Sequence, residues 1–238
     1  MTRSREVRYR SHQLTLAAPN WLNNYRIDTF ATKEPETLDW IDSIPEGAVL
    51  WDVGANVGLY GIYAAKARKC QVYAFEPSVF NLELLARNIF LNSVQKRVII
   101  CPFALSDVSG VNSFRLSTTA WGGALSAFGA SFDQNGAPLK DIFEYQIFGL
   151  AIPDAVNLLN IPQPTYMKID VDGIEHLILR GAREILTRVE SVLIEINDAF
   201  LEQAEEAKRL LNAAGLRCER KCDLEVPNMF NQWWVRAR

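Results

Sequence analysis

The chain has 238 residues, of which 25 are basic and 28 acidic, so its formal net charge at pH 7 is -3. This length suits one α/β domain with additions, and the charge balance gives no general attraction to nucleic acid or to an anionic membrane. No apolar run is long enough to span a membrane, and the charged start lacks the apolar segment of a secretory signal. We therefore expect a cytoplasmic protein, whose four scattered cysteines are reduced.

Residues 1–46 are expected to form an N-terminal extension that ends in a helix. The sequence of residues 1–34 is mixed and does not indicate a task. The segment from Pro35 to Ile44 predicts a helix with Pro35 in its first turn, and with Leu38 and Ile41 turned inward.

A buried strand that turns sharply into a helix begins the main domain, which we place at residues 47–238. Val49 to Val53 form a short apolar run that is typical of a central parallel strand, and the helix begins at Leu59. Gly54 and Gly58 permit the abrupt turn between them. The unpaired N–H groups of the first helical turn then point toward the carboxyl end of the strand, where a nucleotide-like ligand is expected.

The spacing Asp52-x-Gly54-x-Asn56-x-Gly58 differs from the G-x-G-x-x-G of dinucleotide sites. Asn56 replaces the middle glycine, which lets the backbone approach a pyrophosphate. Asp52 places a carboxylate where it would repel a pyrophosphate but would suit a cationic amino group. Both features favour S-adenosylmethionine, which has an amino acid tail and a sulfonium but no phosphate.

The second predicted strand, Gln71–Glu76, ends on an acid. Glu76 follows the glycine-rich turn by about 20 residues, the spacing at which α/β nucleotide folds bind a ribose diol. The alternative is an ordinary acidic residue at the start of the next helix. A third strand at Arg97–Pro102 should bring Phe103, Ala104 and Asp107 to the border of an adenine site.

An inserted loop is predicted at about residues 117–145, after a strand at Val111–Leu116. Long loops inside compact domains are commonly lids or binding loops. The rings of Trp121, Phe128 and Phe132 suit stacking on the face of a sugar. A disordered insertion is the alternative.

A cluster of ionisable residues surrounds the carboxyl end of a strand predicted at Tyr166–Ile169. The cluster consists of Lys168, Asp170, Asp172 and Glu175. We expect this strand beside the first one, at the edge where open α/β sheets bind ligands. Such clusters are candidate catalytic or metal sites, and the alternative is an ion-pair network that caps the next helix.

The remaining elements complete the expected sheet. A strand at Ser191–Ile196 ends near the same edge with Glu195, which could orient a substrate or face water. The segment Phe200–Ala214 predicts an amphipathic helix that is stopped by Gly215 and has Leu201 on its apolar face.

The ordered motifs between about residues 48 and 197 resemble the FkbM family of S-adenosylmethionine-dependent methyltransferases. The resemblance is carried by Asp52-Val-Gly-Ala-Asn-Val-Gly58, Phe75-Glu-Pro77, Ala104-Leu-Ser-Asp107, Lys168-Ile-Asp-Val-Asp-Gly173 with Glu175, and Leu179-x-Gly181-Ala182. It implies a Rossmann-like class I methyltransferase fold, an α/β fold with helices on both faces of a seven-stranded, mostly parallel sheet whose last strand is antiparallel. It also implies methyl transfer to oxygen, commonly on a hydroxyl of a sugar or natural product.

The resemblance also assigns residues to the cofactor, S-adenosylmethionine. It implies that Asp52, Gly54, Asn56, Gly58 and Glu76 bind it, and we add the neighbouring or facing residues Ala55, Pro77, Ala104 and Asp170 to the expected set. The sequence departs from the family at Asp172, where a longer Glu is more usual.

Methyl transfer to a hydroxyl requires an oxygen in line with the methyl group, and help in removing the proton of that oxygen. Asp170 is the first candidate for this base and His176 the second, and Lys168 completes the expected catalytic set. His176 is expected to be solvated, because it faces away from the apolar stripe of its helix. Alternatively, Asp170, Asp172 and Glu175 could hold a divalent cation that acidifies the hydroxyl.

Three functions are thus compatible with the sequence. The first is an O-methyltransferase with a small-molecule or glycan acceptor. The others are a nicotinamide-dependent oxidoreductase, which Asn56 disfavours, and a nucleotide-binding module without activity. A nucleic-acid acceptor is disfavoured because the sequence lacks a basic stripe, and a homo-oligomer is compatible with the sequence.

Overall fold

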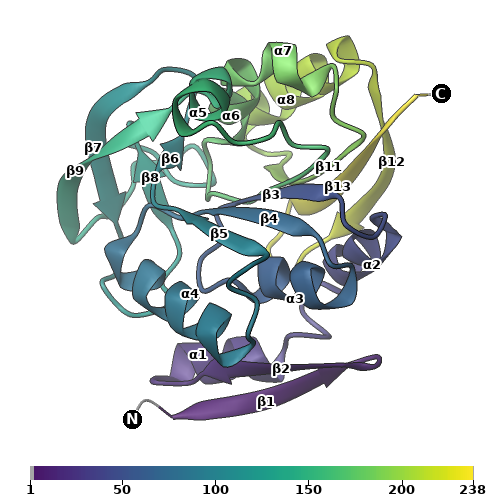
Figure 1. Cartoon of the computed structure of the whole chain (residues 1–238). Coiled ribbons are helices and arrows are strands. Elements are labelled where there is room, and N and C mark those ends of the chain that lie inside the picture. The colour runs from purple at the N-terminus through teal and green to yellow at the C-terminus, as the bar shows by residue number, and fades with distance from the viewer. Residues whose placement is uncertain (1–2, 238) are drawn as a thin grey trace.

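A seven-stranded sheet forms the centre of the protein, whose computed structural model describes residues 3–237. Its strands are β3 (Val49–Val53), β4 (Gln71–Phe75), β5 (Val98–Cys101), β10 (Tyr166–Ile169), β11 (Ser191–Asn197), β12 (Leu216–Asp223) and β13 (Met229–Arg236). The strand order is β12-β13-β11-β10-β3-β4-β5 (Figure 1). The strands run parallel except for β13, which is antiparallel to both of its neighbours. The predicted α/β fold with a mostly parallel sheet and an antiparallel last strand is confirmed.

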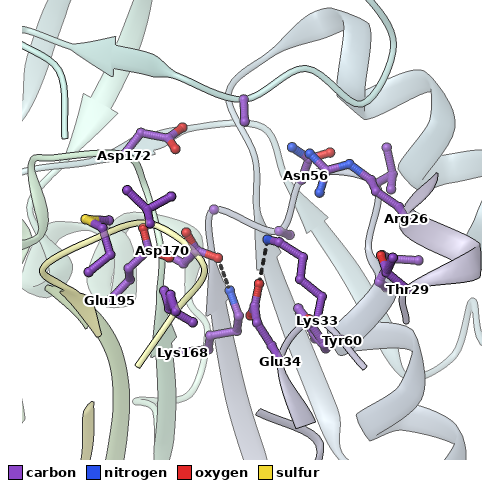
Figure 2. A pocket seen from close by; sticks show the side chains of 18 of the residues that line it. Arg26, Thr29, Lys33, Glu34, Asn56, Tyr60, Lys168, Asp170, Asp172 and Glu195 are labelled. Carbon is purple, nitrogen blue, oxygen red and sulfur yellow. Dashed lines mark hydrogen bonds and ion pairs between the residues drawn. The ribbon is translucent and has the colours of Figure 1, made fainter. Parts of the chain in front are cut away.

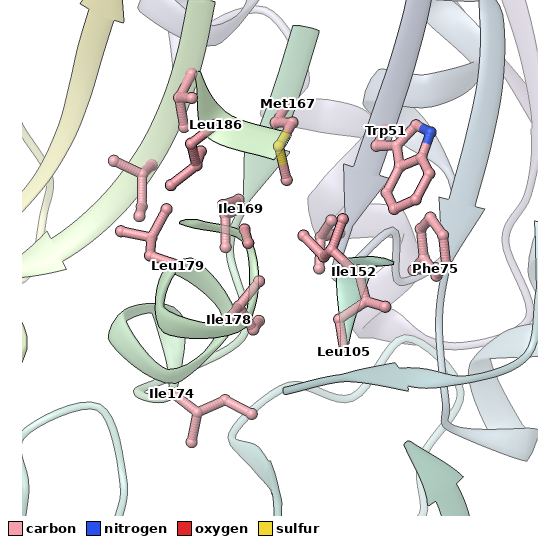
Figure 3. Packing of buried hydrophobic residues seen from close by; sticks show 14 of the residues in the cluster. Trp51, Phe75, Leu105, Ile152, Met167, Ile169, Ile174, Ile178, Leu179 and Leu186 are labelled. Carbon is pink, nitrogen blue, oxygen red and sulfur yellow. The ribbon is translucent and has the colours of Figure 1, made fainter. Parts of the chain in front are cut away.

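Helices cover both faces of this sheet, which is why its central strands are continuously apolar. On one face lie α2 (Pro35–Ser43), α3 (Leu59–Ala67) and α4 (Val79–Leu91); on the other lie α5 (Ile152–Leu159), α6 (Glu175–Gly181), α7 (Arg183–Leu186) and α8 (Leu201–Ala213) (Figure 1). The helix α1 (Trp21–Asp28) lies beside the N-terminal strands. Figure 3 shows the second face, where Met167 and Ile169 of β10 pack against Ile178 of α6. The prediction that Leu201 is turned inward is wrong, because it begins α8 and its side chain is 65% exposed.

A second, four-stranded sheet lies beside the first. It consists of β6 (Ala104–Leu105), β7 (Gly110–Leu116), β8 (Ser126–Phe128) and β9 (Phe143–Leu150), in the order β6-β9-β7-β8. Of these strands, β8 and the start of β9 fall within the predicted insertion. The disordered alternative for residues 117–145 does not hold, since Phe128 of β8 pairs with Phe114 of β7 and both are buried.

The N-terminal residues form a hairpin that packs on the helices of the first face. It consists of β1 (Ser4–Tyr9) and β2 (His12–Ala17). Leu14 and Leu16 alternate into the core, as expected for a strand with one buried face. A side chain of α4 satisfies a backbone group on the open edge of β2: Asn88 Oδ1 accepts the N–H of Ala17 at 2.7 Å. Within residues 3–237, no helix is long and apolar enough to cross a membrane.

Candidate active site

Two neighbouring cavities lie at the carboxyl ends of the central strands, the edge at which ligands bind in open α/β sheets. The larger, of about 260 Å³, is formed by the ends of β3, β10 and β11, the segment between α1 and α2, and the loop between β12 and β13 (Figure 2). The smaller, of about 50 Å³, lies toward β4 and β6. Both cavities are lined by Gly54, Asn56, Ala124, Asp170 and Asp172.

The turn after β3 brings the backbone against the end of β10. Gly54 has φ +81°, and a Cβ atom there would lie 1.8 Å from the carbonyl oxygen of Asp170. Gly58 has φ +84°, and a Cβ there would lie 2.4 Å from Leu85, so this glycine allows α3 to approach α4. Asn56 also has positive φ, which Asn tolerates better than most residues. The motif spacing is therefore required by the shape of this turn.

Asp52 is a buried carboxylate without a partner. It is 2% exposed, and neither of its carboxylate oxygens has a hydrogen-bond partner within residues 3–237. Burial raises the pKa of Asp52, and the nearby Lys168 ammonium and the backbone N–H of Gly61 oppose this shift. An unpaired buried acid calls for an explanation, because its lost hydration is not replaced. Since Asp52 lines the larger cavity, a cationic group of a ligand would satisfy it.

Glu76 lines the smaller cavity and joins the turn after β3 to the start of α4. Its Oε2 accepts the N–H of Asn56 at 2.8 Å, and its Oε1 accepts the N–H of Ser78 at 2.8 Å. Burial raises the pKa of Glu76 to about 7, although these N–H groups oppose the shift. Pro77 and Ala104, from the expected cofactor set, line the same cavity. The structure thus brings these predicted residues together at one end of the site.

The buried Lys168 and the half-buried Asp170 form an ion pair in the larger cavity (Figure 2), with Lys168 Nζ 2.7 Å from Asp170 Oδ2. Burial disfavours the ammonium, but Asp170, Asp52 and Glu34 outweigh it and raise the pKa of Lys168. Burial likewise disfavours the carboxylate of Asp170, but Lys168 outweighs it and lowers the pKa of Asp170. Lys168 is therefore an ammonium without a lone pair, so it cannot accept a proton.

The three candidate metal ligands bind different groups. Asp172 Oδ2 accepts the N–H of Leu125 at 2.7 Å, and Glu175 Oε1 accepts the N–H of Val171 at 3.0 Å. Asp170 is held by Lys168. In the described part of the chain, no group of three or more His, Cys, Asp or Glu residues is arranged to hold a metal ion.

His176 is buried rather than solvated, so this expectation is wrong. It is 1% exposed and packs between two rings, with centroid distances of 6.4 Å to Phe132 and 5.7 Å to Phe200. Burial lowers the pKa of His176. Helical periodicity could not show that Phe132, from the predicted insertion, covers this face. His176 is not among the residues that line either cavity.

A strap, defined here as residues 121–126, crosses the site. Asn56 Nδ2 donates to the carbonyl of Gly123 at 2.8 Å, and Arg26 Nη2 donates to the carbonyl of Gly122 at 2.7 Å. Asn81 binds both strap residues, accepting the N–H of Gly122 at 3.0 Å and donating to Gly123 at 3.1 Å. The strap is thus fastened from α1, from the turn after β3 and from α4.

Part of the larger cavity comes from residues that sequence reasoning did not identify. They are Arg26, Thr29, Lys33, Glu34 and Tyr60. Figure 2 shows Asp170, Asp172 and Glu195 along one wall, with Arg26, Thr29 and Lys33 facing them. Arg26, Thr29, Lys33 and Glu34 lie in the N-terminal extension, where no motif marks them. Tyr60 follows the glycine-rich turn, and its position at the start of a helix was the only available signal.

Glu195 lies next to Asp170 in the sheet, because Ile194 of β11 pairs with Ile169 of β10. It lines the larger cavity. Burial and the surrounding carboxylates, of which Asp170 acts most strongly, raise the pKa of Glu195 well above its usual range.

Comparisons with known proteins agree with this geometry. A family model described as the methyltransferase FkbM domain matches residues 52–219. The hexuronic acid methyltransferase AglP of Haloferax volcanii is 28% identical over 179 residues, which cover 75% of this chain and 67% of AglP. An rRNA methylase from Streptococcus thermophilus has a TM-score of 0.54 at 12% identity, covering 87% of this chain and 97% of that one. A precorrin-6y C5,15-methyltransferase from Geobacter metallireducens has a TM-score of 0.51 at 13% identity, covering 86% and 87%. The two structural likenesses confirm the Rossmann-like methyltransferase fold.

Proposed function

Since the chain belongs to the methyltransferase FkbM domain family, and is therefore a methyltransferase, we propose that it methylates an oxygen of a sugar or glycan with S-adenosylmethionine as donor. The observation that carries the proposal is the unpaired carboxylate of Asp52 in the wall of the larger cavity. A cationic amino group would satisfy it, whereas a pyrophosphate would be repelled.

The residues of the two cavities suit the parts of this cofactor. Asp52 would bind the amino group, Glu76 the ribose, and Phe103 and Ala104 would border the adenine; the last three line the smaller cavity. The pKa of Glu76, raised by burial to about 7, would fall when hydroxyl groups donate to its carboxylate. Gly54 would let the cofactor lie close to the backbone.

When bound, S-adenosylmethionine supplies a methyl group whose bonding electron pair stays on the sulfur. The acceptor oxygen therefore provides the electron pair of the new bond and loses its proton. The chain has to orient that oxygen, exclude water and receive the proton. The Lys168–Asp170 ion pair would orient the acceptor, and the strap would exclude water. The proton would go to a carboxylate of this wall, for which Asp170 and Glu195 are the two candidates.

A sugar acceptor is supported by two observations. AglP, the curated relative, is by its name a hexuronic acid methyltransferase. The larger cavity is rich in groups that hydrogen-bond hydroxyls, including Thr29, Gln134 and Asp170, and it also contains the cations Arg26 and Lys33. Arg26, which forms no ion pair within residues 3–237, would bind a carboxylate that is carried by the sugar.

The proposal is tested by methyl transfer from labelled S-adenosylmethionine to a panel of acceptors. The panel contains methyl glycosides of glucuronic and galacturonic acid, the matching neutral glucosides and galactosides, and short oligosaccharides of each, all with and without chelator. We expect label on at least one sugar, and faster methyl transfer to the hexuronic acids than to the matching neutral sugars. Cofactor binding without label on any member would contradict the proposed acceptor class and favour a silent binding module.

A further inference from the structure

The carboxylates of the larger cavity differ in whether they already have a partner. Asp170 is held by Lys168, and Asp172 by backbone N–H groups of the strap. Glu34 accepts a hydrogen bond from Lys33 at 2.8 Å. Glu195, in contrast, accepts no hydrogen bond and forms no ion pair with any of residues 3–237. Glu225, in the loop between β12 and β13, also lines this cavity but is exposed, so Glu195 is the partly buried acid on the β11 side that is available to a substrate.

The strand register places Glu195 on the same face as the other charged residues of the cavity. Lys168 of β10 pairs with Asp52 of β3 and with Leu193 of β11. Because side chains alternate along a strand, Asp170 and Glu195, each two residues further on, point to the face of Asp52. Three carboxylates thus stand in a row across three neighbouring strand ends, with that of Asp170 in the middle.

We propose that Glu195 is the general base of the reaction and that the Lys168–Asp170 pair positions the acceptor rather than receiving its proton. This inference rests on the proposed function. As the acceptor oxygen forms its bond to the methyl carbon, the proton of that oxygen moves to a carboxylate oxygen of Glu195. The electron pair of the broken carbon–sulfur bond stays on sulfur. Glu195 then passes the proton to water after the product leaves.

The charges around Glu195 suit this task. Four acids act on it: Asp170 and Asp172 in the turn after β10, Glu175 in α6, and Glu34 in the segment before α2. Asn231, its neighbour on β13, is neutral, and the cations Lys168 and Lys33 already have carboxylate partners. This crowding, together with burial, raises the pKa of Glu195, which makes its carboxylate a stronger proton acceptor than that of Asp170. A cationic cofactor would lower that pKa again, so binding should release a proton from Glu195.

The first test measures proton release and needs no acceptor. S-adenosylmethionine is titrated calorimetrically near neutral pH in buffers of different ionisation enthalpy, against the wild type, E195Q and E205Q. Glu205 is exposed on α8 and serves as the matched control. We expect a fraction of a proton to be released by the wild type and by E205Q, and clearly less by E195Q. When the demethylated product, whose sulfur is neutral, binds to the wild type, fewer protons should be released than when S-adenosylmethionine binds.

Gln mimics the protonated carboxyl, so E195Q should fold and bind the cofactor. Equal proton release by E195Q and the wild type would overturn the inference. If the wild type does not bind S-adenosylmethionine at all, the proposed function itself fails.

The second test compares rates on whichever panel sugar the wild type methylates. E195Q should lower kcat by about 10²- to 10⁴-fold, the usual contribution of a general base, and remove the rising limb of the pH profile. D170N should keep that rising limb and mainly raise the KM of the acceptor. A kcat of E195Q close to that of the wild type, or loss of the limb in D170N instead, would overturn the assignment.

Discussion

At the scale of single residues, the acids of the site differ in whether they have partners. Glu175 and Asp172 receive backbone N–H groups, and Asp170 receives an ammonium. Neither carboxylate oxygen of Asp52 has a hydrogen-bond partner of good geometry within residues 3–237, and only the nearby Lys168 ammonium and the backbone N–H of Gly61 offset the burial of its charge. A buried acid that lacks a partner lowers the stability of the free protein, and its charge is available to a ligand. We therefore interpret Asp52 as a residue kept for binding.

Substituting Asp52 tests this interpretation. D52N removes the charge but keeps the shape, so the affinity for S-adenosylmethionine should fall by about tenfold or more, as expected for loss of a charge-assisted hydrogen bond. The free energy of unfolding should not fall, because the unpaired charge disappears. Calorimetry and urea unfolding measure the two quantities. D141N, at an exposed residue away from the cavities, is the control. An unchanged affinity of D52N would show that Asp52 does not contact the cofactor.

Sequence reasoning identified some of these residues and misjudged others. Asp52, Glu76 and Asp170 could be placed at strand ends because a turn after an apolar run marks where a strand stops. His176 was misjudged because its cover comes from Phe132 and Phe200, which are distant in the sequence. The partners of a side chain depend on tertiary contacts, which a local pattern does not contain.

At the scale of elements, the strap connects parts of the site that are far apart in sequence. Asn81 binds the backbone of both Gly122 and Gly123, and Asp172 binds the N–H of Leu125 from the other side. The strap lines both cavities through Ala124. A ligand that occupies both cavities would therefore contact the strap.

Loosening the strap should therefore weaken binding. N81A removes two hydrogen bonds to the strap, so amide exchange in residues 117–126 should become faster, and the affinity for S-adenosylmethionine should fall by up to about tenfold. Hydrogen-exchange mass spectrometry and calorimetry measure these effects. F90A, which removes a side chain 78% exposed on the same helix, should change neither. Unchanged exchange in N81A would mean that Asn81 does not hold the strap.

The elements themselves were predictable to different degrees. β3, β4, β10 and β11 were found because a strand buried on both faces is a short apolar run between turn residues. The hairpin of β1 and β2 and the strand β9 were missed. Exposed residues interrupt the apolar pattern of β1 and of β9, which alternates between exposed and half-buried side chains over most of its length. In β2, polar residues at half-buried positions weaken the pattern. Nothing local indicated that residues 26–34 would reach the cavity.

At the scale of the whole molecule, one structure combines a large apolar core with several buried acids on its ligand-binding edge. Burial raises the pKa of Glu175 to about 7 from an ordinary value of 4.5. Between these values the folded protein holds a proton that the unfolded chain has lost. The contribution of Glu175 to stability therefore falls as the pH rises through this window.

This linkage predicts the pH dependence of a variant. E175Q cannot ionise, so its free energy of unfolding relative to the wild type should increase between about pH 5 and about pH 7.5, by at most about 1.4 kcal/mol per pH unit. A constant offset from the altered hydrogen bonds is expected in addition. Urea unfolding at several pH values measures the difference. A difference that does not change with pH would contradict the raised pKa of Glu175.

The most direct test of the whole account is a calorimetric titration of the purified protein with S-adenosylmethionine, its demethylated product and NADH. Saturable heat with the first two ligands and none with NADH is the predicted result. No heat with S-adenosylmethionine, or tighter binding of NADH, would contradict the claim that an unpaired acid at the end of β3 serves a cationic methyl donor.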